Sequence, residues 1–154
     1  MKILVLSDSH GNYGPMEAAL TIEKPELVIF LGDGAGDIAL LERQNPSQRI
    51  LKIKGNGDFF HSGAAFICDI FDGVKIYAVH GHIQRVKESI NGILYAAKAE
   101  KAAIALYGHT HRQMIKRIDG ITLINPGSIG CGQAYGVIVT DNGSFECVLK
   151  NCKL

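Results

Sequence analysis

Five apolar segments of this chain each end in polar residues that lie beside glycine. The segments cover residues 3–6, 27–31, 49–53, 74–79 and 103–107. Short, strongly apolar segments of this kind are typical of buried strands. In open α/β sheets, the loops beyond the carboxyl ends of the strands meet at one crevice, whatever their separation in sequence. We therefore expect the following polar residues to converge on one site: Asp8, His10, Asp33, Asn56, His80, His109 and His111.

The remaining pattern alternates strand and helix in the first half of the chain and runs through hairpins in the second. Apolar residues at helical spacing predict helices at about 15–24 and 85–101, and Asp37 is expected to cap a short helix through residues 40–42. Residues 125–128 are expected to form a loop. Asp-Gly and Asn-Gly turns predict hairpins that join 66–70 to 74–79, 114–118 to 121–124, and 136–140 to 145–149.

Length and composition exclude several classes of protein. The chain has 154 residues, which suits a single domain spanning residues 1–154 with one buried core. A net charge of +1 provides no general attraction to nucleic acid or membranes, and no segment approaches the roughly 18 apolar residues of a membrane span. The first residues lack a signal-peptide pattern and the four cysteines form no C-x-x-C pair, so we expect reduced thiols and a cytoplasmic location.

The converging residues are of the types that bind metal ions. Asp8 and His10 are two apart, so in an extended chain their side chains point the same way, although a D-x-H motif alone is a weak signal. Two carboxylates, one amide and four imidazoles are too many ligands for one tetrahedral ion and suit two adjacent ions. Mixed oxygen and nitrogen ligands favour Mn²⁺, Fe, Zn²⁺, Co²⁺ or Ni²⁺ over Ca²⁺. Because no cysteine is in the set, a structural zinc finger is not expected.

One of these motifs, and a carboxylate outside the set, have simpler interpretations. The Asn56-Gly57 pair is a strong hairpin-turn signal, and taken alone that interpretation is favoured. Asp37 is interpreted as a helix cap rather than as part of the site.

The order of the motifs D-x-H, G-D, G-N-x-D, H-G-H and G-H-T-H resembles the calcineurin-like metallophosphoesterase superfamily. The short chain, the H-G-H motif and the Asn-Pro-Gly-Ser segment at 125–128 resemble its small YfcE-type phosphodiesterase branch. This resemblance covers Asp8 to Ser128. It implies a four-layer α/β/β/α sandwich of two mixed β-sheets flanked by helices, and hydrolysis of small phosphodiesters.

The resemblance also implies roles for individual residues. Asp33 would bridge two divalent transition-metal ions, with Mn²⁺ expected first and Ni²⁺, Co²⁺, Fe or Zn²⁺ as alternatives. A hydroxide shared by both ions would attack phosphorus, so Asp33 and Asn56 also belong to the catalytic set. Since ligation needs neutral histidine, activity should fall in acid. Asp8, His10 and His111 would hold one ion, and Asn56, His80 and His109 the other.

One position departs from the pattern of the resembling family. Many members have histidine after the G-N pair, and the YfcE-type branch usually has cysteine, whereas this chain has Gly57. Glycine has no side chain with which to donate a proton or bind phosphate. The mechanism must therefore rely on the metals, on water or on another donor. Our hypothesis for that donor is His82, which would contact phosphate or donate the proton, against the alternative that it is a supporting or surface histidine.

Five other polar residues have open or structural interpretations. Asp58 would either orient a ligand or stabilise a turn, and Asn12 lies near the expected site but also suits a helix cap. His61 is interpreted as a loop residue. Arg85 and Arg112 would either bind phosphate or remain solvated charges.

Three other functions are compatible with this pattern. A phosphomonoesterase or a nuclease would use the same site, although neutral charge and the lack of an aromatic, basic groove argue against long nucleic acids. A eukaryotic sorting-complex subunit resembles this family and serves mainly as a protein scaffold. The complete set of ligand residues favours an enzyme over that scaffold. We expect a small phosphodiester as partner and no membrane, while the physiological substrate, the metal in the cell and the oligomeric state, including a homo-oligomer, stay open.

Overall fold

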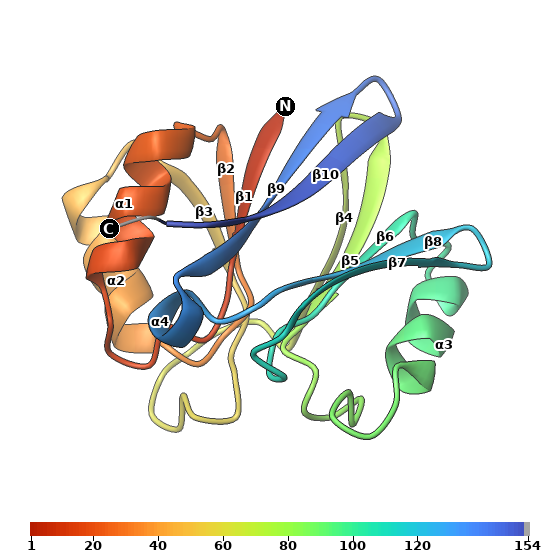
Figure 1. The fold of residues 1–154 in the computed structure, drawn as a ribbon, viewed down its shortest axis with the longest axis horizontal. Coiled ribbons are helices and arrows are strands. Elements are labelled where there is room, and N and C mark those ends of the chain that lie inside the picture. Colours follow the sequence, from red (N-terminus) through yellow and green to blue (C-terminus); the bar gives the residue numbers. More distant parts are fainter. Residues whose placement is uncertain (153–154) are drawn as a thin grey trace.

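In the computed structural model, which describes residues 1–152, two five-stranded sheets pack face to face (Figure 1). The first sheet contains β1 (Lys2–Leu6), β2 (Leu27–Phe30), β3 (Arg49–Lys52), β9 (Ala134–Asp141) and β10 (Ser144–Asn151), in the order β10-β9-β1-β2-β3. The second contains β4 (Phe66–Phe71), β5 (Val74–Val79), β6 (Ile104–Leu106), β7 (Gln113–Ile118) and β8 (Ile121–Pro126), in the order β4-β5-β6-β8-β7.

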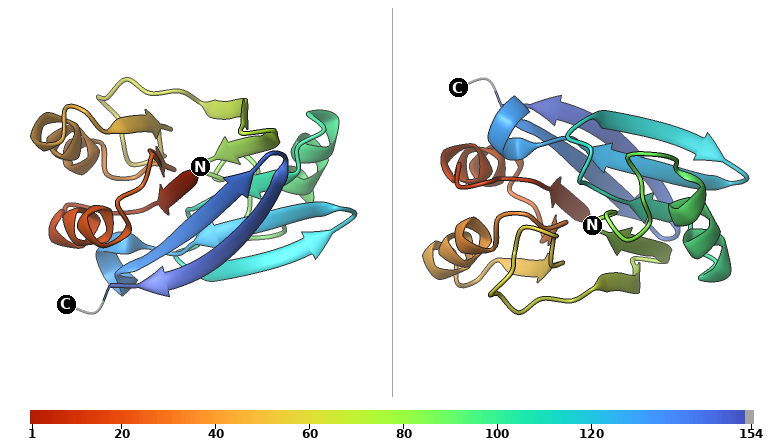
Figure 2. Two further views of the ribbon diagram at one scale, coloured as in Figure 1. Left: turned by 90° about the horizontal axis from the view of Figure 1, so that it is seen from above. Right: turned by 90° about the horizontal axis from the view of Figure 1, so that it is seen from below.

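Helices form the two outer layers. Figure 2 shows α1 (Gly14–Glu23) and α2 (Ala35–Gln44) beside the first sheet and α3 (Asn91–Ala99) beside the second. The short helix α4 (Ile129–Gly132) packs near α1. The predicted four-layer α/β/β/α sandwich of mixed sheets is therefore confirmed. None of the helices within residues 1–152 has the length and apolar character that crossing a membrane requires.

Successive side chains of β1 point to opposite faces of the first sheet, and this alternation explains the layering. Ile3 and Val5 belong to the core cluster between the two sheets, whereas Leu4 and Leu6 belong to the cluster beneath α1 and α2. A third cluster packs Ile93 of α3 against the outer face of the second sheet. Because β1 is covered on both faces, its sequence is apolar throughout.

The strand directions bring the polar ends of the strands to one edge of the molecule. β1, β2 and β3 are parallel neighbours in the first sheet, and β5, β6 and β8 are parallel neighbours in the second. The loops that follow β3, β5 and β6 lie together at the lower end of Figure 1. The convergence predicted from the strand ends follows from this arrangement.

Three local predictions were wrong. The helix expected at 85–101 begins only at Asn91, because turns precede it and Arg85 has a left-handed φ of 54°. Asp37 lies inside the first turn of α2, whose N-cap is Gly34, and its carboxylate accepts hydrogen bonds from Ser9 Oγ and Gly11 N–H instead. The expected loop at 125–128 belongs partly to β8 and leads into α4.

The hairpin interpretation of Asn56-Gly57 is also wrong. β3 pairs in parallel with β2, and the segment after it forms a loop. Ile53 makes an isolated parallel bridge to Ala64 at the far end of that loop. Asn56 is therefore presented at the end of β3 rather than in a hairpin turn.

Candidate metal centre

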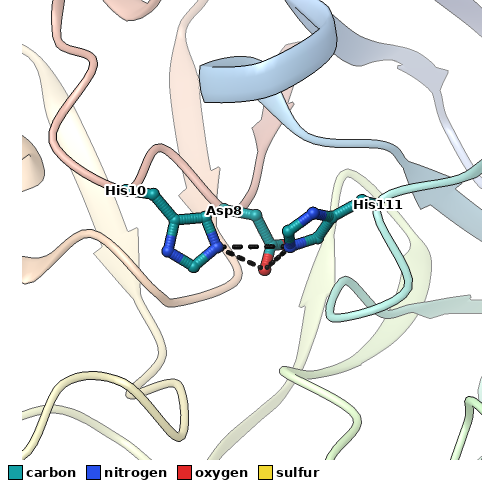
Figure 3. A group of neighbouring side chains, drawn as sticks. All are labelled: Asp8, His10 and His111. Atoms are coloured by element: carbon teal, nitrogen blue, oxygen red, sulfur yellow. Dashed lines mark hydrogen bonds and ion pairs between the residues drawn. The ribbon is translucent and has the colours of Figure 1, made fainter.

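The first group of converging side chains consists of Asp8, His10 and His111 (Figure 3). Asp8 and His10 follow β1, and His111 follows β6 in the other sheet. Asp8 Oδ1 lies 3.2 Å from His111 Nε2 and 3.6 Å from His10 Nε2, and the two nitrogens are 3.2 Å apart. These atoms are close enough together to bind one ion.

The second group consists of Asp33, Asn56, His80 and His109, which follow β2, β3, β5 and β6. His80 Nε2 lies 2.9 Å from Asn56 Oδ1, 3.2 Å from His109 Nδ1 and 3.5 Å from Asp33 Oδ2. His80 Nδ1 lies 2.8 Å from the Leu31 carbonyl, which only accepts hydrogen bonds. Nδ1 therefore carries the proton, and Nε2 of the neutral ring keeps its lone pair for the group.

Asp33 lies between the two groups. Its Oδ2 atom is 4.0 Å from His10 Nε2 in the first group as well as 3.5 Å from His80 Nε2 in the second. Its Oδ1 atom accepts a hydrogen bond of 2.7 Å from Gly57 N–H. The structure thus brings together the whole set of residues expected to converge from the strand ends.

The backbone of this site is strained. Hydrogen bonds between loops hold it: Asp8 N–H donates to the Gly32 carbonyl at 2.9 Å, and His10 N–H donates to the Asp33 carbonyl at 3.1 Å. Such strain is concentrated at functional sites because the surrounding structure must maintain it. Five of the converging residues have a positive φ, which is uncommon for residues other than glycine: Asp8 (56°), His10 (46°), Asp33 (61°), His109 (67°) and His111 (58°).

Two glycines are required by close contacts within the site. A Cβ atom at Gly55 would lie 2.1 Å from Asp33 Oδ1. A Cβ atom at Gly108 would lie 2.0 Å from Ser7 Oγ and 2.8 Å from Asp8 Oδ2. The glycines that precede the G-N and G-H-T-H ligands therefore let neighbouring loops approach each other.

Asp58 connects the loop after β3 to the loop after β2. Its side chain is 5% exposed, and its carboxylate accepts hydrogen bonds of 2.8–3.0 Å from the backbone N–H groups of Asp33, Gly34, Ala35 and Gly55. Both interpretations made from the sequence therefore apply, because the turn that Asp58 stabilises also positions Asp33.

One carboxylate oxygen of the first group has no hydrogen-bond donor. Asp8 Oδ2 accepts from Ser7 Oγ and from His109 N–H, whereas the buried Oδ1 has no hydrogen-bond partner among the described residues. Leaving such an atom unpaired costs free energy unless a cation lies beside it. Since Oδ1 faces two imidazole nitrogens, these residues fit a divalent metal ion.

Comparison with known proteins agrees with this site. Residues 1–142 match the calcineurin-like phosphoesterase superfamily domain. The chain belongs to this superfamily. The resemblance inferred from the order of motifs is confirmed.

Individual relatives support the assignment to the superfamily. Phosphodiesterase MJ0936 of Methanocaldococcus jannaschii is 29% identical over 154 residues, with 89% of each chain covered. A protein of Streptococcus pneumoniae described as a predicted phosphoesterase has 29% identity and a TM-score of 0.82, over 97% of this chain and 88% of that one. Vps29 of Entamoeba histolytica, solved in complex with zinc, has a TM-score of 0.80 over 97% of this chain and 98% of that one. At 18% identity, it shares the fold alone.

Charges within the site shift the pKa values of its residues. Burial opposes ionisation of Asp33, but hydrogen bonds from His80 and Gly57 hold its pKa at about 2. Burial also opposes protonation of His80, yet the Asp33 and Asp8 carboxylates and the Leu31 carbonyl raise its pKa. Burial and the neighbouring His80 lower the pKa of His109. Without metal, the site therefore keeps Asp33 ionised and favours the charged form of His80, in which both ring nitrogens carry a proton.

Two further histidines, His82 and His61, lie beside the two groups of converging residues. The ring centroid of His82 lies 5.4 Å from that of His80, and its Nδ1 atom is buried without a hydrogen-bond partner among the described residues. Burial, followed by the charge of His80, lowers the pKa of His82. His61 lines a cavity of about 230 Å³ with His10, Asp33 and other residues. No sequence signal distinguished His61 from an ordinary loop residue.

The other polar residues considered from the sequence have different positions. Arg85 forms an exposed ion pair with Glu88, so it is a solvated charge. Asn12 donates from Nδ2 to the Gly130 carbonyl and does not cap α1. Arg112 lines a separate cavity beside the site.

The Asn125–Ser128 segment forms hydrogen bonds with the backbone of two loops that carry proposed ligands. Asn125 Nδ2 donates to the Gly108 carbonyl at 3.0 Å. Ser128 Oγ donates to the Asp8 carbonyl at 2.7 Å. The segment therefore holds the loops after β1 and β6 in place.

Proposed function

We propose that this protein is a phosphodiesterase that hydrolyses small phosphodiesters with two divalent metal ions, in a single domain spanning residues 1–154. The observation that carries the proposal is the position of Asp33, whose Oδ2 atom lies within 4.0 Å of imidazole nitrogens in both groups. A carboxylate that faces both groups suits two adjacent ions with a shared ligand. Membership of the superfamily and a relative named as a phosphodiesterase support the same activity.

In this proposal the chain holds the ligand atoms in position for the ions. Two bound metal ions would supply a nucleophile near neutral pH and positive charge opposite the phosphoryl oxygens. The Leu31 carbonyl keeps the His80 ring oriented, and Gly57 N–H keeps the Asp33 carboxylate oriented. Mixed oxygen and nitrogen ligands suit Mn²⁺, Ni²⁺, Co²⁺, Fe or Zn²⁺, and Mn²⁺ is proposed first from the resemblance to the family. Asp8, His10 and His111 would hold one ion, Asn56, His80 and His109 would hold the other, and Asp33 would be shared by both.

His82 is proposed to contact a phosphoryl oxygen or to donate a proton to the leaving oxygen. It lines a cavity of about 370 Å³ together with Asn56 and Phe59, beside the second group of ligands. Gly57, which follows Asn56, has no side chain to serve either purpose. His82 is therefore a candidate for either role on this side of the site.

A non-catalytic scaffold is the second candidate function, and its support is the likeness to the fold of Vps29. A scaffold does not need a complete set of ligand residues. The unpaired Asp8 Oδ1 favours the enzyme, because a buried oxygen without a partner costs stability when no metal ion is bound. The position of Asp33 between the two groups supports the enzyme as well, because it suits a ligand shared by two ions.

The deciding experiment is a metal titration of protein stripped with a chelator. Hydrolysis of p-nitrophenyl diesters, monoesters and cyclic nucleotides is measured with each candidate ion. We expect diesters to be cleaved fastest and only with added metal, and Asp33→Asn to abolish the activity. Asp119→Asn, an exposed carboxylate in the β7–β8 turn, is the control. Faster cleavage of monoesters would indicate a phosphomonoesterase, and no cleavage with any ion would favour the scaffold.

A further inference from the structure

A cavity of about 460 Å³ lies beside the proposed metal centre, between the loop that precedes α3 and the loop that follows β6. Thr110 lines it, and this residue lies between the two ligand histidines His109 and His111 in the sequence. Much of the wall is apolar and includes Val86 and Tyr107. A group bound in this cavity would therefore be a close neighbour of the metal centre.

Two cations line this cavity without an acidic partner. Lys87 and Arg112 form no ion pair within residues 1–152, whereas Arg85 and Lys98 on neighbouring elements are both paired. No carboxylate is among the lining residues. An ammonium and a planar guanidinium that share one cavity without a counter-charge attract an anion, and the guanidinium suits phosphate or carboxylate best.

The hydroxyl of Thr110 provides a third donor. Its Oγ1 atom accepts hydrogen bonds from Asn125 Nδ2 at 2.9 Å and from Arg112 N–H at 3.2 Å. The orientation of the Asn125 amide is determined, because its oxygen accepts from Gly127 N–H and its nitrogen also donates to the Gly108 carbonyl. Both lone pairs of the Thr110 hydroxyl are thus engaged, and its proton is free for another acceptor.

We propose that this cavity binds a second anionic group, a phosphate or a carboxylate, carried on one ester arm of the substrate. Arg112 and Lys87 would neutralise its charge, and Thr110 would donate a hydrogen bond to it. This inference rests on the proposed function, because the scissile phosphate must lie at the metal centre for the arm to reach the cavity. It defines the substrate class as small phosphodiesters with an additional negative charge.

Matched esters test the proposal. The substrates are the p-nitrophenyl ester of a nucleotide, the same ester with a further phosphate on the sugar, and the same ester with a carboxylate there. We expect kcat/KM to be roughly tenfold or more higher for an ester with the additional phosphate or carboxylate than for the parent ester. The reason is that only the additional anion can form charge-assisted hydrogen bonds in the cavity. The preference should weaken as salt concentration rises. The difference between the two charged esters identifies the preferred anion.

Substitutions identify the residues responsible for the preference. Arg112→Gln and Lys87→Gln should each reduce the preference for the charged ester by about tenfold. Arg117→Gln removes an exposed cation from β7 that does not line the cavity, and it should leave the preference unchanged. Equal kcat/KM for the esters in the wild type, or the same loss in Arg117→Gln, would overturn the proposal.

A binding measurement separates this proposal from the proposed activity. If no ester is hydrolysed, the proposed activity fails, and calorimetry with a nucleoside bisphosphate and the matching monophosphate still tests the cavity. Tighter binding of the bisphosphate that disappears in Arg112→Gln supports the anion site. Equal binding of the two compounds, or bisphosphate binding that Arg112→Gln does not weaken, overturns it.

Discussion

Replacing Asp8 with asparagine should have opposite effects on stability with and without metal. The asparagine oxygen can accept the hydrogen bonds that Asp8 Oδ2 now receives from Ser7 Oγ and His109 N–H. The asparagine NH₂ group would then occupy the position of Oδ1, 3.2 Å from His111 Nε2, where no hydrogen bond is made in the wild type. The substitution therefore removes an unpaired buried charge without breaking a hydrogen bond.

The size of each effect follows from general magnitudes. Without metal, the free energy of unfolding of Asp8→Asn should equal that of the wild type or exceed it by about 1–3 kcal/mol, the cost of an unsatisfied buried group. With an ion at about one hundred times its dissociation constant, the wild type gains about 2.7 kcal/mol, a gain that the variant loses. For a chain of this length, each kcal/mol shifts Tm by about 2–4 °C.

Thermal unfolding in chelator and in Mn²⁺ measures both effects, and Asp58→Asn is the matched control. Asp58 is equally a buried carboxylate, but its two oxygens accept four backbone N–H groups. An asparagine NH₂ group would face two of those donors, so this variant should lose roughly 2–4 kcal/mol under both conditions. The reasoning about Asp8 is refuted if Asp8→Asn without metal is destabilised as much as Asp58→Asn, or if Mn²⁺ stabilises Asp8→Asn as much as the wild type.

Three other substitutions have defined outcomes. Burial opposes ionisation of Glu23, but hydrogen bonds from Lys150 and Tyr135 lower its pKa below the usual 4.5. The ionised carboxylate therefore stabilises the fold above that pH, and this contribution disappears in acid. Urea unfolding should show that Glu23→Gln loses less stability than the wild type as pH falls. Gly55→Ala should lower both Tm and metal-dependent turnover, because its Cβ would overlap Asp33. His82→Ala should slow diesters with poor leaving groups more than nitrophenyl esters in steady-state assays, and equal effects would exclude proton donation.

Much of the fold and the converging residues could be predicted because they depend on local pattern. Buried strands need continuous apolar sequence, as in β1, and parallel strands place their ends at one edge. Asp33 and Asn56 could be located from neighbouring glycines, although the sequence alone allowed a hairpin at Asn56. The four-layer arrangement came from the resemblance rather than from periodicity.

The features that could not be predicted depend on contacts between distant segments. Helical spacing correctly placed Ile93 and Ala97 in α3 but did not reveal that the chain turns at Arg85. Asp37 is of a residue type that often caps helices, yet its carboxylate accepts hydrogen bonds from Ser9 and Gly11, which lie far away in sequence. The position of His61 beside the site depends on the path of a loop that has no periodic pattern.

Each group of proposed ligands draws on loops from both sheets. In the first group Asp8 and His10 follow β1 and His111 follows β6, and in the second Asp33 follows β2 and His80 follows β5. Ions bound there would cross-link the two halves of the sandwich at one edge, beside the core that fills the space between them. Metal starvation would therefore do more than stop turnover, because the halves could part more easily and expose that core to proteases.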